Sequence, residues 1–387
     1  MHTAMLSAAA RDANPYIDLL CRGLAAEGIA VTLLDQPGDG ALPAPAGAAD
    51  LLHLHWLELW GKPAYTSLAQ LSRWGAPGRG LRRWLEPALN SAAHTDHRRQ
   101  RFLDQFFAAL AEYRARGGRV LYTVHNLGQH EGEGAAVEAA ALQRLLHEVD
   151  AVHVHSRALA DEMRRRLSNA PTPVAVIPHV NYRAAYANTV SGTDARRALH
   201  LRAVDDSASP TFLFFGLLRP YKGLEELLPA FRRLSDSQAT LLVAGRPRPN
   251  DFAARLAVQV SNDPRVRWHP QFVPNDDVQL WMNAADAVVL PYRQITTSGA
   301  AMLAWSFGKP IIAPALPAFT EPLADAPFLG LLYDPAAPNG LADALQQAAT
   351  INWPSQRAAI LAWVDQFSWQ RTGQQMAALY RQVLKAA

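Results

Sequence analysis

Short apolar runs that alternate with helical patterns constrain this chain more than any other feature of its sequence. In the first half, runs typical of buried strands cover residues 29–34, 51–55, 120–125, 151–155 and 174–177. Helical spacing fills the intervals, over residues 16–27, 102–116, 135–147 and 159–167. Alternation of this kind is typical of a parallel sheet with helices on both faces. The pattern therefore predicts an α/β fold.

The alternation stops over residues 183–209 and then restarts, which indicates two units. Strand-like runs return at residues 211–215, 240–244, 266–269, 287–290, 310–313 and 328–332. We expect an N-terminal Rossmann-like domain over residues 1–182, joined by a C-terminal helix over 368–387, and a second one over 210–367. The interval between them is expected to be a linker with one short helix. Ligands of such sheets bind beyond the carboxyl ends of the strands.

Composition favours a globular protein from a reducing compartment. Hydrophobic residues make up 49% of the 387 residues, and charged residues 18%. The single cysteine, Cys21, excludes an internal disulfide and a cysteine-based zinc site. We find neither a signal-peptide pattern nor an apolar run of about 18 residues, so a cytoplasmic location is expected.

A basic segment with interleaved tryptophans runs from Arg73 to Arg101. It holds seven arginines against Glu86 and Asp96, together with Trp74 and Trp84. Such a stretch suits the anionic inner face of the plasma membrane, and it suits equally a solvated loop between two helices. No nucleic-acid-binding motif accompanies the charge, so nucleic acid is not the expected partner.

Residues 214–223 combine the features of an anion-binding loop. An apolar run ends at Gly216, Arg219 and Lys222 follow, and a helical pattern begins at Leu224. Backbone N–H groups, the helix dipole and two cations would converge on one point. The phosphates of a nucleotide are the expected guest, and an ordinary strand-to-helix turn with solvated cations is the alternative.

This loop and the strand ends after it resemble a known family. The residues that carry the likeness are Gly216, Lys222, Gly223, Gly245, Val273 and Tyr292. The set is similar to the donor-binding half of GT-B glycosyltransferases, in particular the Leloir enzymes of family four, and the likeness extends over nearly the whole chain. It implies two Rossmann-like domains facing each other across a cleft, with a C-terminal helix that crosses back to the N-terminal domain. It also implies a nucleotide sugar as substrate.

The chain departs from the family pattern on the donor side. The arginine that usually follows the first glycine is Leu217, and Arg219 lies two residues further on. The family's paired glutamates correspond to Ile295 and Leu303, which cannot bind a sugar or a ribose. The loss of this pair leaves retaining and inverting transfer both open.

The loop before the next helix offers hydroxyl groups instead, from Thr297 and Ser298 with Gly299 after them. Hydroxyls and backbone N–H groups at a helix N-terminus bind phosphate well, and the same side chains can act as a plain N-cap. Glu321 lies beyond the following strand. It is a candidate for binding ribose hydroxyls, or else a carboxylate at a helix N-terminus.

The N-terminal half is expected to hold the acceptor and the base. His125 and Asn126 end a buried strand and resemble the acceptor-side segment of the family, and Glu131 follows. Transfer needs an acceptor hydroxyl made nucleophilic, for which His125 and Glu131 are the catalytic candidates. His55 and Trp56 end another strand and are expected on the acceptor side or in packing. Because no third ligand accompanies His53 and His55, a metal is not expected.

The prediction is a metal-independent glycosyltransferase of bacterial polysaccharide synthesis with no cofactor beyond its donor substrate. GDP-mannose is preferred as donor over a UDP-sugar, and a glycan or lipid-linked glycan hydroxyl is the acceptor. The chain has no Asp-x-Asp pair, so Arg219 and Lys222 would neutralise the diphosphate. Two alternatives remain, a sugar-nucleotide epimerase of the same architecture and a non-catalytic sugar-nucleotide-binding subunit.

Overall fold

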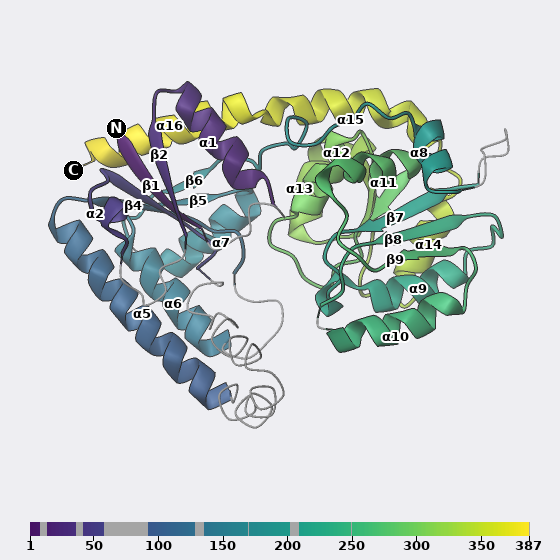
Figure 1. Ribbon diagram of the computed structural model, residues 1–387, viewed down its shortest axis with the longest axis horizontal. Helices are drawn as coiled ribbons and strands as arrows, with labels where there is room; N and C mark the ends of the chain where they lie inside the picture. The colour runs from purple at the N-terminus through teal and green to yellow at the C-terminus, as the bar shows by residue number, and fades with distance from the viewer. Residues whose placement is uncertain are drawn as a thin grey trace, which may run out of the picture.

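The computed structural model describes residues 1–7, 14–35, 42–57, 92–127, 135–168, 170–201, 209–248 and 250–386. Two parallel six-stranded sheets form the centres of two units that lie next to each other (Figure 1). Each sheet is covered by helices on both faces, which confirms the predicted pair of Rossmann-like domains.

The first sheet has the strand order β2-β1-β3-β4-β5-β6. Its strands in chain order are β1 His2–Ser7, β2 Ala30–Asp35, β3 Leu51–His55, β4 Arg119–Thr123, β5 Ala151–Val154 and β6 Val174–Val176. The sequence interpretation found all of them except β1. That strand carries only two large apolar residues, Met5 and Leu6, so its pattern is weak although it lies in the interior of the sheet.

The second sheet has the order β12-β11-β10-β7-β8-β9. Its strands are β7 Thr211–Phe215, β8 Thr240–Ala244, β9 Val266–His269, β10 Ala287–Val289, β11 Ile311–Pro314 and β12 Gly330–Tyr333. The strand order reverses between β7 and β10, which are neighbours although β8 and β9 intervene in the chain. Ligands bind at such a switch point, beyond the carboxyl ends of the strands.

The helices follow the predicted pattern. Their bounds are α1 Tyr16–Ala26, α2 Ala44–Gly47, α5 Ala92–Ala115, α6 Ala135–Glu148, α7 Arg157–Leu167, α8 Gly192–Ala198, α9 Leu224–Arg232, α10 Asn250–Ser261, α11 Val278–Ala284, α12 Gly299–Ser306, α13 Pro317–Asp325, α14 Gly340–Ala348, α15 Arg357–Val364 and α16 Trp369–Lys385.

Alternating side chains of each strand pack on opposite faces of its sheet. On β7, Phe212 and Phe214 pack with α9 and α10, whereas Leu213 packs with α11 and α12. On β3, Leu52 and Leu54 pack with α5, α6 and α7, whereas Leu51 packs with α1 and α16. This period of two is the expected consequence of a pleated strand buried on both faces.

The C-terminal helix α16 returns to the first unit and lies against α1 (Figure 1). The two helices cross at Gly23 and Gly373. A Cβ atom added to Gly373 would lie 2.3 Å from the carbonyl carbon of Gly23. Only glycine allows backbones to approach this closely, so the pair fixes where α16 crosses. The predicted crossing helix is confirmed.

The segment expected as a linker packs onto the second unit through α8. Arg196 donates to both carboxylate oxygens of Asp286 at 2.9 Å and to the Ala284 carbonyl at 2.9 Å. The short helix within residues 183–209 is therefore part of the surface of the second unit.

Candidate active site

The loop after β7 folds tightly against two other strand ends. Gly223 has φ +74°, and a Cβ atom there would lie 1.9 Å from the Pro291 carbonyl oxygen. At Gly245, with φ +149°, a Cβ atom would lie 1.8 Å from the Gly216 carbonyl oxygen. Both positions demand glycine, because any side chain would collide with backbone. The ends of β7, β8 and β10 are thereby held together.

Lys222 occupies the centre of this loop. Its ammonium nitrogen lies 5.6 Å from the centroid of the buried Tyr292 ring, in a cation–π contact. Desolvation, with the nearby charge of Arg219, lowers the pKa of Lys222 to about 8. None of the described carboxylates forms an ion pair with it. The site therefore holds a desolvated positive charge that an anion would compensate.

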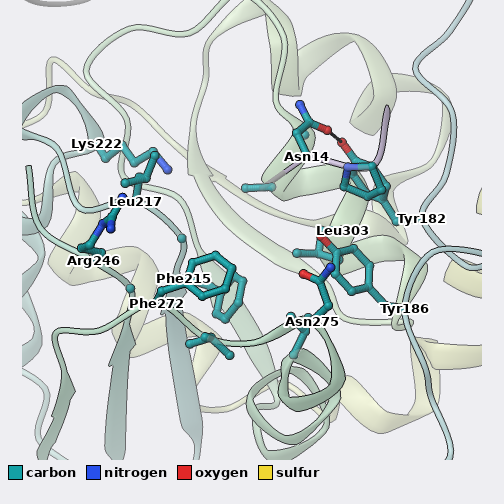
Figure 2. Close-up of a pocket in the computed structure, with 17 residues that line it drawn as sticks. Asn14, Tyr182, Tyr186, Phe215, Leu217, Lys222, Arg246, Phe272, Asn275 and Leu303 are labelled. Atoms are coloured by element: carbon teal, nitrogen blue, oxygen red, sulfur yellow. Dashed lines mark hydrogen bonds between the residues drawn. The ribbon is translucent and has the colours of Figure 1, made fainter. Parts of the chain in front are cut away.

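A pocket of about 370 Å³, which we call the first pocket, opens in front of Lys222 and is shown in Figure 2. Lys222 and Arg246 lie at one end of it, whereas Asn275, Tyr186 and Leu303 lie at the other. Among the predicted donor residues, the lining includes Gly216, Lys222, Gly245, Val273 and Gly299. The first pocket thus has a cationic end and a mostly apolar end. Such a pocket suits a ligand in which a charged group is joined to a flat ring.

Two aromatic side chains line the middle of the first pocket. Phe215 ends β7, and Phe272 projects with 53% of its surface exposed. A flat ligand in the first pocket would cover part of this exposed apolar surface.

The first unit contributes Asn14 and Tyr182 to the same pocket. The Tyr182 hydroxyl donates to Asn14 Oδ1 at 3.2 Å, as Figure 2 shows. Asn14 Oδ1 also accepts the backbone N–H of Tyr16 at 3.1 Å. A Cβ atom on Gly299 would lie 3.2 Å from the Tyr182 hydroxyl. These polar groups therefore stand directly above the start of α12.

The start of α12 separates the first pocket from a second cavity of about 460 Å³. Ser298 is the N-cap, and its hydroxyl accepts the Ala301 N–H at 3.2 Å. Thr297 and Ser298 line the second cavity, whereas Gly299 lines the first pocket. The predicted hydroxyl loop is thus divided between two cavities.

Glu321, a predicted donor residue, lies outside the first pocket and on the rim of the second cavity. Its carboxylate accepts the backbone N–H groups of Arg157 and Ala158 at 2.9 and 3.0 Å. Those are the first two residues of α7, so Glu321 of α13 caps a helix of the other unit. The structure therefore gives Glu321 the role of the alternative interpretation, a carboxylate at a helix N-terminus.

Arg219 and Tyr292 are not among the residues that line the first pocket. Tyr292 is 3% exposed, and its buried ring contacts the Lys222 ammonium group. Arg219 precedes the short helix at 220–222 and acts on Lys222 through its charge. The pocket-lining second cation is Arg246.

His125 and its neighbours form a buried cluster at the ends of β3, β4 and β5. The His125 ring stacks on Trp56 with centroids 3.9 Å apart, and its Nε2 lies 3.0 Å from His55 Nδ1. Burial, reinforced by neighbouring imidazoles, holds the pKa values of His55 and His125 well below the usual range. Both rings are therefore neutral at pH 7. Neither lines the first pocket or the second cavity.

Asn126 is half-buried beside His125, and Glu131 lies outside the described residues. Most of the basic segment also lies outside them. At its described end, Arg99 is buried in an ion pair with Glu138 of α6. This arginine is therefore unavailable to a membrane surface, whereas Arg101 is exposed.

Several pocket residues escaped the sequence interpretation. Arg246 directly follows Gly245, so reading one residue beyond the matched strand end would have found it. Asn14 and Tyr186 come from two distant segments with no shared pattern. Only the folded chain brings them together.

Within the described ranges, no group of three or more His, Cys, Asp or Glu residues is arranged to hold a metal ion. The described helices also include none with the length and apolar character needed to span a bilayer.

Two family patterns match the two units. Residues 13–180 match the family described as Glycosyltransferase Family 4, and residues 209–350 match Glycosyl transferases group 1. The chain belongs to the group 1, family four glycosyltransferases. Solved structures with the same fold include sucrose-phosphate synthase from Thermosynechococcus elongatus, with TM-score 0.69, 19% identity and 100% of both chains covered. For Anabaena HepE in complex with UDP-glucose the TM-score is 0.69 at 15% identity, covering 99% of this chain and 100% of that one.

Curated relatives are more similar in sequence but match over shorter stretches. A GDP-mannose:glycolipid 4-beta-D-mannosyltransferase of Xanthomonas campestris pv. campestris is 31% identical over 205 residues, 51% of this chain and 50% of that protein. A D-inositol 3-phosphate glycosyltransferase of Streptomyces griseus is 28% identical over 283 residues, 65% of this chain and 58% of that protein. The chain thus spans about half the length of the curated relatives it matches.

Proposed function

We propose that this glycosyltransferase moves a sugar from a nucleotide-diphosphate sugar to a hydroxyl group of a glycan or lipid-linked glycan. The observation that carries the proposal is the desolvated Lys222 at the cationic end of the first pocket. A half-buried cation without a carboxylate partner costs free energy in the empty site, and a diphosphate would recover it. The leaving diphosphate would be stabilised in the same way during transfer.

The pocket suggests how the donor lies. The diphosphate would contact Lys222, Arg246 and the start of α12. The nucleoside would extend toward Phe272 and Leu303, with Asn275 as a polar group for the base. Because Leu303 replaces a carboxylate, the ribose would pack against an apolar surface. In this arrangement the phosphates would lie between Lys222 and the start of α12.

We further propose GDP-mannose as the donor, ahead of a UDP-sugar. The support is the Xanthomonas relative, whose name specifies GDP-mannose and a glycolipid acceptor. The two pocket cations would neutralise the diphosphate, so transfer is proposed to be metal-independent. A glycolipid acceptor would bring the enzyme, as a cytoplasmic peripheral protein of bacterial polysaccharide synthesis, to the inner face of the membrane.

The experiment is a thermal-shift panel of GDP, UDP, ADP, dTDP and CMP on the wild type and on Lys222→Met. A ligand that binds only the folded state raises the melting temperature by mass action. We expect one nucleoside diphosphate to stabilise the wild type and to lose this effect in Lys222→Met. The matched control is Arg248→Met, a nearby exposed cation that does not line the pocket.

Equal stabilisation of Lys222→Met and wild type would contradict the site. Nucleotide binding without sugar transfer to any glycan acceptor would instead support a non-catalytic sugar-nucleotide-binding subunit. Conversion of the donor to its epimer without an acceptor would support a sugar-nucleotide epimerase.

A further inference from the structure

The second cavity lies between the two units, on the opposite side of the start of α12 from the first pocket. His155, Val176 and His179 line it from the first unit, at the ends of β5 and β6. Residues of α12, α13 and α15 line it from the second unit. The volume of about 460 Å³ falls in the range of small-ligand sites. Of the predicted donor residues, Thr297, Ser298 and Glu321 line it, whereas none of the predicted acceptor-side residues does.

The hydrogen bonds of its two histidines fix their tautomers. His155 Nδ1 lies 3.1 Å from the Ile177 carbonyl oxygen, and His179 Nδ1 lies 2.8 Å from the Val180 carbonyl oxygen. A carbonyl can only accept, so each Nδ1 carries the hydrogen. Burial lowers the pKa of His179 to about 4 and that of His155 well below its usual range, so both rings are neutral. Each therefore keeps a lone pair on Nε2.

Two polar atoms of cavity-lining residues lack a hydrogen-bond partner among the described residues. They are His155 Nε2 and Thr297 Oγ1, both buried from solvent. His155 is itself buried, with 8% of the residue exposed. An unpaired buried polar atom costs about 1–3 kcal/mol. A ligand that donates hydroxyl hydrogens to such atoms would recover this cost.

The charges on the rim disfavour an anionic ligand. Arg157 is already paired with Glu321 at 3.3 Å and with Asp325 at 3.0 Å. The remaining recognition groups include imidazole lone pairs, which accept hydrogen bonds from hydroxyl donors and repel phosphate oxygens. The cavity therefore differs in chemistry from the first pocket, where cations dominate.

Aromatic rings supply the apolar wall of the second cavity. Trp305 and Trp363 pack edge to face with centroids 5.3 Å apart, and Phe367 lies 4.7 Å from Trp363. Trp305 Nε1 donates to the Leu329 carbonyl, so its indole is held in place. Rigid aromatic faces beside hydrogen-bond acceptors suit a sugar ring, which has an apolar C–H face and a rim of hydroxyls.

We propose that the second cavity binds a neutral pyranose ring of the acceptor glycan, whose hydroxyls donate to His155 and His179. This inference rests on the proposed glycosyl transfer and adds the place of the acceptor. The donor would reach the start of α12 from the first pocket, and the acceptor would reach it from the other side.

The test is NMR of the full chain with ¹⁵N-labelled histidine. The probes are cellobiose and the methyl α- and β-pyranosides of glucose, mannose and galactose, with inorganic phosphate as the anionic probe. Without ligand, His155 and His179 should both show the Nδ1–H tautomer. At least one saccharide should shift their Nε2 resonances, phosphate should not, and the resonances of the exposed His147 should stay unchanged.

Two variants localise the binding. Thr297→Val keeps the shape and removes the hydroxyl, and we expect saccharide affinity to fall about tenfold or more, as is typical when a hydrogen bond from a buried site is lost. Trp363→Ala should abolish binding, whereas Trp268→Ala, which removes a tryptophan of another core cluster, should not. A melting temperature close to wild type would show that each variant is folded.

The proposal is wrong if no saccharide shifts the two histidines, or if phosphate shifts them instead. The saccharide experiment and the nucleotide panel test different claims. Nucleotide stabilisation without saccharide shifts would remove only the acceptor site. Saccharide shifts without nucleotide stabilisation would remove the donor assignment and leave a sugar-binding cavity.

Discussion

At the scale of single residues, Lys222 determines what the first pocket can bind. Its position was predictable because Gly216, Lys222 and Gly223 lie in one short loop motif. Arg246, Tyr186 and Asn14 were not predictable as a set, because they meet only through folding. A short sequence motif reveals the part of a site that one loop carries, and no more.

The lowered pKa of Lys222 predicts proton uptake when a nucleotide binds. With its pKa near 8, much of the lysine is neutral at pH 8.5, and a diphosphate would raise the pKa and recharge it. Calorimetry in two buffers of different ionisation enthalpy at pH 8.5 should detect a fraction of a proton taken up. Lys222→Met should show none, and equal uptake in both proteins would contradict the assignment.

The lowered pKa of Lys222 also predicts how the free energy of unfolding depends on pH. The folded pKa near 8 lies below the ordinary value of 10.5, so between these values the unfolded chain binds more protons. Stability contributed by this group therefore rises as pH rises from about 8 to 10.5. Urea unfolding across this window should show a steeper rise for wild type than for Lys222→Met, and parallel curves would argue against the shift.

At the scale of elements, the sequence revealed most strands and helices, because buried parallel strands are apolar throughout. It could not reveal how α16 attaches to the first sheet. His153 Nε2 donates to the Ile177 carbonyl oxygen at 3.0 Å, so Nδ1 of the same ring is a hydrogen-bond acceptor. This fixes the donor and acceptor of each following hydrogen bond. Thr123 donates to His153, His53 donates to Thr123, and Tyr380 of α16 donates to His53. These buried histidines thus tie the last helix to the core.

Removing the last donor of this chain should weaken the attachment of α16. Tyr380→Phe would leave His53 Nδ1 buried without its partner, which costs about 1–3 kcal/mol. Urea unfolding should show this loss. Tyr186→Phe, outside the chain of bonds, is the control, and equal stabilities for both variants would contradict the interpretation.

The crossing of α1 and α16 should be sensitive to the size of the side chain at residue 373. Gly373→Ala would place a methyl group against the backbone of Gly23 and force the helices apart, at a cost of about 1–3 kcal/mol. Gln374→Ala, on the exposed side of α16, should change little. Thermal unfolding of both variants measures the difference, and a stable Gly373→Ala protein would show that the helices can separate freely.

At the scale of the whole molecule, contacts across the cleft hold the two units in one arrangement. Glu321 of α13 caps α7, and the backbone N–H of Tyr182 donates to Ser306 Oγ of α12 at 2.9 Å. The family resemblance implied a cleft but could not indicate which side chains bridge it. Glu321 in particular was predicted from the sequence as a ligand-binding residue, and the backbone N–H groups that it accepts could not be predicted.

Loss of the Glu321 charge should loosen α7. In Glu321→Gln we expect the Arg157 and Ala158 amides to exchange hydrogen several-fold faster, since a carboxylate at a helix N-terminus contributes about 0.3–2 kcal/mol. Asp325→Asn, which changes only an exposed pair with Arg157, is the control. Hydrogen exchange by mass spectrometry distinguishes them, and unchanged exchange in Glu321→Gln would contradict the cap.

The central claim is sugar transfer from a nucleotide donor held at Lys222. The direct measurement supplies radiolabelled GDP-mannose, and then UDP-glucose, with a bacterial glycolipid extract, and follows label into the lipid fraction. We predict transfer by the wild type and by Arg248→Met, and a loss of about 100-fold or more in Lys222→Met, as for loss of a preorganised charge-stabilising group. Labelled lipid formed equally by Lys222→Met, or by none of the proteins with either donor, would contradict the account.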